Sequence, residues 1–414
     1  MNILVVTQYF WPESFRINDL ARGLHDRGHE VTVFTGKPNY PEGCFYSGYG
    51  FFGRSAEKFE GIRVIRVPLI PRGAGGAARL ALNYLSFAFF ASLLAPFRVR
   101  GRFDVILVYE PSPVTVGLPA LALKALKRAP LLFWVQDLWP ESLAATDAVR
   151  AGWILKAVQH LVRFIYRGCD RILVQSQAFV EPVLRYGIAR ERILYFPNSA
   201  EGFYQPVTLE PDAAERPHMP EGFRVMFAGN VGAAQDFDTI LGAAERVKGE
   251  TAIHWIILGD GRLLSWVETE VKRRGLGRSV HLLGRHPVES MPRFFALADA
   301  MLVTLRRDPI LAMTVPARVQ SYLACARPIV AALEGEGARV IREAGAGIAA
   351  DAGDPDGLAR AVLELYRMPE TERQAMGERG RRYFEQEFER EKLLIRLEGW
   401  MGELARSRKP ELWK

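Results

Sequence analysis

The 414-residue sequence predicts an α/β protein with two doubly wound domains, each built on a parallel sheet that helices cover on both faces. Short apolar runs of strand length alternate with helical stretches along most of the chain, as is typical of this fold class. The alternation stops at one proline-rich stretch and then starts again, so two domains are expected. The length agrees, because a single domain of this size is unusual and two of about 200 residues are common.

Six apolar runs in the first half of the chain have the length of buried strands. They are apolar throughout, which indicates a parallel sheet buried on both faces. Helical patterns at Ile17–Arg27 and Ile154–Arg167 lie between some of them. The expected strands are Ile3–Thr7, Val31–Thr35, Ile62–Val67, Val105–Tyr109, Leu131–Val135 and Ile172–Gln175.

Residues 197–222 contain five prolines and little periodicity, which is typical of a linker, and the strand–helix pattern resumes after them. The expected strands are Arg224–Ala228, Ile253–Leu258, Val280–Leu283, Ala300–Leu305 and Pro328–Leu333. The expected helices are Phe237–Lys248, Leu263–Gly275, Met291–Leu297, Pro316–Ala324, Ala338–Ala344, Gly357–Arg367, Thr371–Glu389 and Glu391–Arg406. The pattern does not show where the last of these packs. We expect an N-terminal domain at 1–200, a linker at 201–222, a C-terminal domain at 223–390 and a C-terminal helix and tail at 391–414.

The composition excludes several classes of protein. The net charge of +7 suits anionic ligands, but no run of five Lys or Arg residues indicates a nucleic-acid-binding tail. Cys44, Cys169 and Cys325 lie far apart, which argues against a disulfide scaffold, a zinc ribbon or an iron–sulfur cluster. The chain begins with a strand pattern and lacks the features of a signal peptide, so a cytoplasmic protein is expected.

Residues Leu80–Phe97 carry no charge, and a helix of this length is roughly 27 Å long, close to the thickness of a bilayer core. A membrane span is rejected because the flanking strands Ile62–Val67 and Val105–Tyr109 must join one sheet. Two interpretations remain open: a buried crossover helix, or a helix in the membrane interface whose basic flanks contact anionic lipid. The basic flanks are Arg72, Arg79, Arg98, Arg100 and Arg102.

Glycine turns point to a phosphate ligand in the second half of the chain. The loop after the first strand, Gln8–Ser14, contains no glycine, which argues against a Rossmann dinucleotide site. Turns at Gly229–Gly232, Gly259–Gly261 and Glu334–Gly337 each follow an expected strand, and the last two open helices. Free backbone N–H groups at such positions bind phosphate, so a nucleotide diphosphate is predicted, with three chance turns as the alternative.

No metal site is expected. Two Asp-x-Asp strings, Asp236–Asp238 and Asp354–Asp356, have the form that holds a divalent cation on a nucleotide diphosphate. Both precede expected helices, where aspartate is a favoured N-cap, and capping is the preferred interpretation. His25 and His29 are four residues apart, but Gly28 at the end of a helix separates them, so a metal pair is disfavoured.

Several short strings occur in an order that resembles the GT-B glycosyltransferases of family 4, which are retaining and metal-independent. The resemblance runs nearly from end to end. Its strings are Arg27–Val33, Tyr195–Asn198, Phe227–Asn230, Leu258–Gly261, Leu283–Gly284 and Pro316–Ala324. Thr35–Gly43 and Gln136–Ser142 resemble a subgroup that includes N-acetyl-L-fucosamine and related deoxyaminosugar transferases of bacterial O-antigen and capsule clusters.

The resemblance implies an acceptor-binding N-terminal domain and a nucleotide-sugar-binding C-terminal domain that face a central cleft. It implies transfer of a UDP-linked N-acetyl-deoxyaminosugar or N-acetylhexosamine to a polyprenyl-diphosphate-linked saccharide in bacterial surface polysaccharide synthesis. No cofactor, metal or nucleic acid is expected. Together with the apolar segment, the resemblance implies peripheral contact with the cytoplasmic face of the inner membrane through Leu80–Phe97 and its basic flanks.

The sequence departs from the family at several standard contacts. The family's Arg and Lys after the first glycine turn appear as Asn230 and Gln235, and the second Glu of its Glu-x7-Glu pair aligns with Ser321. The His in its first-domain loop appears as Gln136. Arg318, in the first turn of an expected helix, is the preferred replacement for the diphosphate because guanidinium groups bind phosphate in bidentate geometry.

The candidate catalytic residues are Asp137, Glu336 and Arg318; an N-cap, a helix-dipole carboxylate and a surface arginine are the respective alternatives. Asp137 follows the Leu131–Val135 strand, and Glu336 lies in a glycine turn where it would hold donor hydroxyls. The candidate donor-binding residues are Gly229, Asn230, Gly232, Gln235, Gly259, Asp260, Gly261, Arg285, Arg306, Arg307, Arg318, Ser321, Glu334, Gly335, Glu336 and Gly337. The candidate acceptor-binding residues are Arg16, Lys37, Asn39, Tyr40, Glu42, Glu110, Trp139 and Glu141.

Two other functions remain open. The substituted family positions also fit a non-catalytic GT-B scaffold of a polysaccharide assembly complex. A non-hydrolysing UDP-sugar epimerase shares the two-domain architecture, but it should carry a richer set of His, Glu and Asp for proton transfer.

Overall fold

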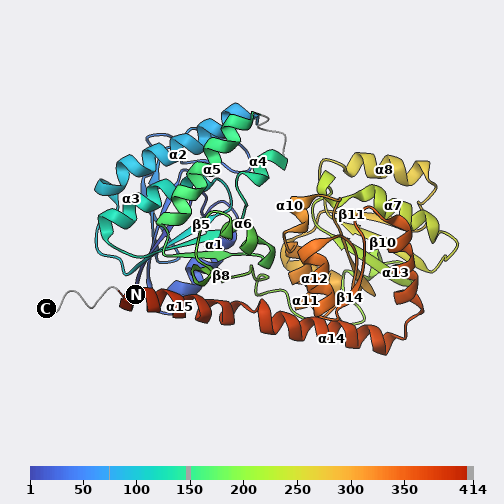
Figure 1. Ribbon diagram of the computed structural model, residues 1–414. Helices are drawn as coiled ribbons and strands as arrows, with labels where there is room; N and C mark the ends of the chain where they lie inside the picture. The colour runs from blue at the N-terminus through green and yellow to red at the C-terminus, as the bar shows by residue number, and fades with distance from the viewer. Residues whose placement is uncertain (74, 146–150, 408–414) are drawn as a thin grey trace. The chain divides into compact units, whose positions relative to one another are not determined.

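The computed structural model describes residues 1–73, 75–145 and 151–407 (Figure 1). The chain divides into two compact units. The first comprises Met1–Phe196 together with Leu393–Lys414, and the second comprises Pro197–Lys392. The chain therefore leaves the first unit once and returns to it near its end.

The first unit is built on an eight-stranded sheet with the order β3-β4-β2-β1-β5-β6-β7-β8, in which only β3 is antiparallel to its neighbour. All six strands expected in this half are confirmed, whereas β3 and β8 are additional. The strands are β1 (Asn2–Val6), β2 (Glu30–Gly36), β3 (Ala56–Phe59), β4 (Ile62–Val67), β5 (Val105–Glu110), β6 (Leu131–Val135), β7 (Arg171–Val174) and β8 (Ile193–Tyr195).

Helices cover both faces of this sheet. The connections β1–β2 and β4–β5 run in opposite directions along the sheet, so right-handed crossovers put their helices on opposite faces. The helices α2, α3 and α5 pack together on one face (Figure 1). The helices of the first unit are α1 (Arg16–Asp26), α2 (Ala77–Arg98), α3 (Gly117–Lys127), α4 (Glu141–Ala145), α5 (Gly152–Gly168), α6 (Val180–Leu184) and, at the end of the chain, α15 (Arg390–Ser407).

Helix α2 connects β4 to β5 within one sheet, which confirms that it does not separate its flanking strands across a membrane. Within the described ranges, it is the one helix long and apolar enough to cross a membrane by length and composition. One face packs into the unit through Tyr84, Phe87 and Ala91, while Leu85, Phe89 and other apolar side chains are exposed. The helix therefore combines a buried crossover face with an apolar outer face.

Helix α15 packs in the core of the first unit, which settles the position that sequence left open. Its apolar face joins residues of α1 and of β1, β2, β5, β6 and β7 in one buried cluster. Glu398 accepts hydrogen bonds from Arg27 (Nε and Nη2, both 2.8 Å) and lies 2.8 Å from His29 Nε2. The apolar contacts and these ion pairs tie the end of the chain to its beginning.

The second unit contains a six-stranded, fully parallel sheet with the order β11-β10-β9-β12-β13-β14. Alternate residues of its strands enter separate buried clusters on the two faces, for example Met226 and Ile256 on one and Phe227 and Trp255 on the other. Its strands are β9 (Phe223–Ala228), β10 (Ile253–Leu258), β11 (Val280–Gly284), β12 (Ala300–Thr304), β13 (Ile329–Ala332) and the unexpected β14 (Gly347–Ala350). Its helices are α7 (Phe237–Arg246), α8 (Leu264–Arg273), α9 (Met291–Phe295), α10 (Pro309–Ala312), α11 (Ala317–Ala324), α12 (Gly335–Glu343), α13 (Pro355–Arg367) and α14 (Glu370–Glu387).

Replacing Glu398 by Gln should loosen α15. Arg27 holds the pKa of Glu398 below its usual value, so this carboxylate stabilises the folded unit at neutral pH and the contribution is lost as the pH falls through the folded pKa. We expect faster amide hydrogen exchange in α15 at pH 7, equivalent to a loss of about 1–3 kcal/mol in its opening free energy. Glu403→Gln, at an exposed position of the same helix, is the control. Equal exchange in both variants would contradict the anchoring role.

Candidate functional site

The loops that leave the carboxyl ends of the first sheet carry several of the expected ligand-binding side chains. Open parallel sheets bind ligands at this edge. Tyr40 follows β2, Glu110 ends β5 and Asp137 follows β6. Because β5 and β6 are neighbours, with Glu110 opposite Val135, Glu110 and Asp137 lie at adjacent strand ends.

Glu110 and Asp137 are two carboxyl groups with little contact with solvent. Glu110 is completely buried, and its carboxylate oxygens have no hydrogen-bond partner of standard geometry in the described part of the chain. Burial raises the pKa of Glu110 well above its usual range, the charge of Asp137 raises it further, and backbone N–H groups of Asp137 and Gln136 lower it. Asp137 is half-buried, and desolvation raises its pKa to about 6. Asp137 is the member of the pair that a ligand can reach.

Three of the expected acceptor-binding residues are enclosed by the protein, which corrects the expectation that they face a ligand. Glu110 has no exposed surface. Lys37 is buried, and its ammonium group donates to the carbonyl oxygens of Gly53 (2.8 Å) and Arg54, while burial lowers its pKa to about 8. Asn39 is buried as well and donates to the carbonyl oxygen of Lys37 at 3.1 Å. Lys37 and Asn39 hold loops in place because buried polar groups need partners within the protein.

Glu13 is an organising residue that the sequence reasoning missed. Its buried carboxylate accepts hydrogen bonds from the backbone N–H groups of Asn39 and Tyr40 (2.8 Å each) and of Phe10 (3.3 Å). Burial raises the pKa of Glu13 to about 7, although these donors oppose the shift. Glu13 thus joins the loop after β1 to the loop after β2. In the sequence, Glu13 is marked only as the single acidic residue in a loop that is rich in aromatic side chains.

An aromatic cluster lies on these same two loops. The rings of Tyr9 and Phe15 stack at 5.1 Å, and Tyr40 packs against both at 5.9 and 5.3 Å. The Arg72 guanidinium lies over the rings of Tyr40 (5.0 Å) and Tyr9 (6.0 Å). Of the four, the sequence predicts Tyr40 as an acceptor contact and Arg72 only as a basic flank of the apolar segment. The four come together because β1, β2 and β4 release their loops at one edge.

The remaining acceptor candidates differ in exposure. Glu42 is exposed, and Arg16, at the start of α1, is half-buried. Trp139 is buried; its indole N–H donates to Ser112 Oγ at 3.2 Å, and its ring packs on Tyr84 at 6.1 Å. Trp139 therefore packs inside the unit.

Glu141, at the start of α4, lines a cavity of about 240 Å³ against α5 and α6. Its Oε2 atom is buried and has no hydrogen-bond partner among the residues that the structure describes. The other lining residues are Gln159, His160, Arg163, Pro182, Arg185 and Tyr186.

In the second unit, the glycine turns after β9 and β10 interlock. Gly259 and Gly261 have φ angles of +145° and +159°, which glycine adopts readily. A Cβ atom would lie 1.8 Å from the carbonyl oxygen of Gly229 at the first position and 2.3 Å from that of Val231 at the second. Val231 N donates to the carbonyl oxygen of Asp260 at 2.9 Å. Only glycine lets the two loops approach this closely at the carboxyl edge.

Arg318 reaches this edge from the first turn of α11. Its guanidinium lies 4.4 Å from the centre of the Phe227 ring, and Nη2 lies 3.2 Å from the position that a Cβ atom would take at Gly229. Nη1 is buried and has no hydrogen-bond partner in the described ranges. Desolvation lowers the pKa of Arg318. A desolvated cation without a partner is costly, which makes Arg318 a candidate binding group for an anion.

Most other charged donor-site candidates are paired within the second unit. The ion pairs are Arg306–Asp308 (3.2 Å), Arg307–Glu334 (2.9 Å) and Glu336–Arg339 (2.8 Å). Glu336 is buried in the first turn of α12, the helix that Gly335 begins, where its charge also suits the helix dipole. Arg285 is exposed.

The polar positions that replace standard family contacts are not equivalent. Asn230 Nδ2 lies 3.5 Å from Gln235 Oε1, and both side chains border the first glycine turn. Ser321 is buried, and its hydroxyl donates to the carbonyl oxygen of Ala317 at 3.3 Å. The Ser321 side chain also forms a hydrogen bond with Tyr204, so it is enclosed within the unit, which corrects the expectation that it faces a ligand.

The two Asp-x-Asp strings behave differently as caps. Asp354 accepts a hydrogen bond from Gly357 N at 2.9 Å, which confirms a cap on α13. Asp236 occupies the N-cap position of α7, but its carboxylate accepts from Thr239 Oγ1 at 2.6 Å, so the expected backbone cap is wrong there. No group of three or more His, Cys, Asp or Glu side chains in the described residues is arranged to hold a metal ion.

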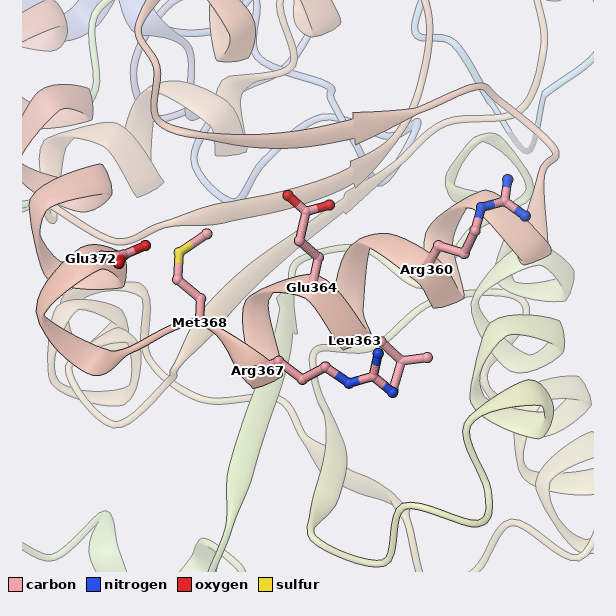
Figure 2. A pocket seen from close by; sticks show the side chains of 6 residues that line it. All are labelled: Arg360, Leu363, Glu364, Arg367, Met368 and Glu372. Atoms are coloured by element: carbon pink, nitrogen blue, oxygen red, sulfur yellow. The ribbon is translucent and has the colours of Figure 1, made fainter.

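A hollow of about 510 Å³ on α13 and the start of α14 contains none of the expected site residues (Figure 2). Tyr366, within this part of α13, packs on Phe223, the first residue of β9. The hollow therefore lies toward the amino ends of the strands, away from the glycine turns. Its lining residues are Arg360, Leu363, Glu364, Arg367, Met368 and Glu372.

Replacing Asp137 by Asn should stabilise the protein at alkaline pH. The folded pKa of about 6 exceeds the ordinary 3.8, so the carboxyl group favours folding at low pH and this contribution is lost as the pH rises through 6. We expect urea unfolding at pH 8 to show a gain of about 1–2 kcal/mol that disappears by about pH 4. Asp26→Asn, at an exposed position in the same unit, is the control. A loss of stability at pH 8 would show that the charged form is well accommodated.

Comparison with known proteins identifies the family to which this chain is related. The Glycosyl transferase 4-like domain matches residues 14–199, and the Glycosyl transferases group 1 family matches residues 222–368. The chain is 25% identical over 338 residues to WcaI of Escherichia coli (strain K12), a glycosyl transferase assigned by name to colanic acid biosynthesis, covering 78% of this chain and 81% of that protein. It is 29% identical over 295 residues to the glycosyltransferase WbjE of Pseudomonas aeruginosa, covering 69% of this chain and 71% of that protein.

The fold is shared with solved structures at lower identity. The crystal structure of Anabaena Alr3699/HepE in complex with UDP matches 97% of this chain and 100% of its own, with a TM-score of 0.70 and 14% identity. Residues 14–199 and 222–368 match glycosyltransferase domains, and each unit is built on a mainly parallel sheet covered by helices. The chain therefore belongs to the group 1 glycosyltransferases of family 4 and has their GT-B fold.

Proposed function

We propose that this enzyme transfers a sugar from a UDP-linked donor to a polyprenyl-diphosphate-linked saccharide, with retention of configuration and without a metal ion. The relatives WcaI and WbjE support a role in bacterial surface polysaccharide synthesis. The observation that carries the proposal is Arg318, a half-buried arginine beside the glycine turn at Gly229, whose buried Nη1 atom has no hydrogen-bond partner in the described residues. A nucleoside diphosphate supplies the missing negative charge.

The donor site would combine Arg318 with the backbone of the glycine turns. The turn at Gly229 borders Arg318, and Gly335 opens α12, a helix N-terminus of the kind that binds phosphate. Arg318 would take over the charge that the family's Arg and Lys provide at the positions of Asn230 and Gln235. The UDP in the HepE structure supports uridine as the proposed nucleoside. The subgroup strings Thr35–Gly43 and Gln136–Ser142 support an N-acetyl-deoxyaminosugar.

The proposed reaction breaks the bond between the anomeric carbon and the diphosphate oxygen and forms a bond from that carbon to an acceptor hydroxyl oxygen on the same face. The leaving diphosphate accepts the hydroxyl proton. Arg318 stabilises the charge that develops on the diphosphate, which is where electrostatic catalysis acts most strongly. Asp137 orients the acceptor hydroxyl, and Glu336 holds hydroxyls of the donor sugar.

The apolar outer face of α2 is proposed to rest on the membrane that carries the acceptor. Its side chains follow a spacing of three or four residues and so form one stripe along the helix. They are Leu82 (48% exposed), Leu85 (58%), Phe89 (61%), Leu93 (53%) and Phe97 (70%). The exposed Arg79 precedes the stripe, and the exposed Arg100 and Arg102 follow it. Aromatic side chains with cations at both ends suit an anionic lipid surface.

UDP should stabilise the wild-type protein through Arg318. We expect UDP to raise the melting temperature equally with and without EDTA, and Arg318→Gln to weaken UDP binding at least tenfold because a charge-assisted contact is lost. Arg278→Gln, an exposed arginine of the same unit, should bind UDP like the wild type. If millimolar UDP, GDP, ADP and dTDP leave the melting temperature unchanged, the catalytic proposal fails and the scaffold interpretation gains support.

Polar substitution in the apolar outer face of α2 should reduce membrane binding. We expect the double variant Phe89→Ser and Phe97→Ser to cosediment with phosphatidylglycerol vesicles at least fivefold less than the wild type, because two large exposed aromatic side chains no longer enter the interface. Ile395→Ser, an exposed apolar residue on α15, is the matched control. Vesicles of neutral phosphatidylcholine should bind all three proteins weakly. Equal binding of the double variant and the control would rule out α2 as the contact.

A further inference from the structure

Arg72 is a positive charge without a carboxylate partner at the carboxyl edge of the first sheet. It follows β4 and precedes α2, and in the part of the chain that the structure describes no acidic side chain forms an ion pair with it. Its Nη1 atom donates a weak hydrogen bond to Tyr9 Oη at 3.4 Å. The Tyr40 and Tyr9 rings lie beneath the guanidinium at 5.0 and 6.0 Å. Its Nε and Nη2 atoms form no hydrogen bond with the described residues, so both can donate to a ligand.

A buried amide network fixes the backbone at Arg72. Arg72 N donates to Asn39 Oδ1 at 3.1 Å, and Asn83 Nδ2 donates to the same oxygen at 3.3 Å and to the carbonyl oxygen of Ile70 at 2.6 Å. Gln8 Nε2 donates to Asn83 Oδ1 at 2.7 Å. Gln8, Asn39 and Asn83 are essentially without exposed surface. The network joins α2 to the loops after β1, β2 and β4, and such buried networks rigidify what they connect.

Tyr40, whose ring lies beneath Arg72, is fixed by contacts that do not involve this amide network. Glu13 accepts the backbone N–H of Tyr40 at 2.8 Å, which fixes the position of this residue. The loops after β2 and β4 also meet where Gly73 N donates to the carbonyl oxygen of Gly43 at 2.7 Å. A Cβ atom on Gly43 would lie 2.0 Å from the carbonyl oxygen of Gly73. The cation and its aromatic support are therefore preorganised before any ligand arrives.

A second guanidinium lies on the same segment. Arg79, in the first turn of α2, donates from Nε to the carbonyl oxygen of Pro71 at 2.9 Å and is otherwise exposed. Its position beside Gly73 brings it close to the segment that carries Arg72. Beyond Arg79, the helix presents the apolar stripe that begins at Leu82. The guanidinium groups of Arg72 and Arg79 therefore lie next to the start of the apolar outer face of α2.

We propose that Arg72, supported by Tyr9 and Tyr40, binds the diphosphate of a lipid-linked acceptor whose hydrocarbon chain lies along the apolar outer face of α2. This inference rests on the proposed function, because it specifies where that function's acceptor is held. The planar guanidinium presents its free N–H groups to phosphate oxygens while the tyrosine rings cover one face. Arg79 would contact the second phosphate. The acceptor sugar would then follow the diphosphate along the carboxyl edge of the sheet.

The test uses farnesyl diphosphate as a soluble probe, titrated calorimetrically into the full-length protein with UDP present. We expect the wild type to bind it, Arg72→Gln to bind at least tenfold more weakly, and Arg72→Lys to fall between them because it keeps the charge but loses the planar donor pair. Arg63→Gln, an exposed arginine on β4, should bind like the wild type. Inorganic pyrophosphate should bind more weakly than farnesyl diphosphate, and Arg72→Gln should weaken the binding of pyrophosphate as well.

The outcomes separate this inference from the proposed function. If the wild type binds UDP but not farnesyl diphosphate, or if all the arginine variants bind the probe equally, the Arg72 site is wrong and the proposed function stands. If pyrophosphate binds as tightly as farnesyl diphosphate, the site takes free phosphate and the lipid part of the inference is overturned. If the probe binds through Arg72 but UDP does not bind, the inference stands and the proposed donor fails. Unchanged amide exchange in α2 of Arg72→Gln would show that the variant is folded.

Discussion

Parallel strand pairing is the constraint on which the rest of this structure depends. Parallel neighbours must release their connecting loops at the same edge of the sheet, so residues far apart in sequence meet there. In the first unit this brings Tyr9, Tyr40, Arg72 and Asp137 to one edge from four different strands. In the second unit, parallel pairing places the turns at Gly229 and Gly259 in direct contact.

Glu110, Asp137 and Arg318 differ from the residues of structural ion pairs in how completely their charges are balanced. Glu398 and Glu270 have arginine partners that hold their pKa values low. Glu110, Asp137 and Arg318 are desolvated and have no such ion-pair partner among the described residues, and each has its pKa shifted toward the neutral form. Uncompensated burial lowers stability, and proteins retain it mainly where a ligand supplies the missing partner.

Helix α2 links the architecture to the proposed membrane contact. One side of the helix must be apolar to cover the sheet, and Asn83 on that side is buried in the amide network that fixes Arg72. On the opposite side, Leu85, Phe89 and Phe97 are exposed although they are apolar. A crossover helix needs only one apolar face to cover the sheet, and the exposed second face is the feature from which the membrane contact is proposed.

The sequence by itself determined the fold class, the two-domain organisation and nearly every strand, because apolar runs between helical patterns leave few alternatives. It did not reveal β3, which alternates in exposure, β8, which has three residues, or β14, which is rich in Gly and Ala. Its glycine turns and its acidic residues at strand ends predict which loops form the candidate site. Only tertiary structure decided that Lys37 and Glu110 are enclosed, that Glu13 and Arg72 organise the first edge, and that α15 completes the first unit. The reason is that burial, hydrogen-bond partners and charge pairing come from contacts between segments distant in the sequence. The local sequence pattern indicates only which helix or strand each segment can form by itself.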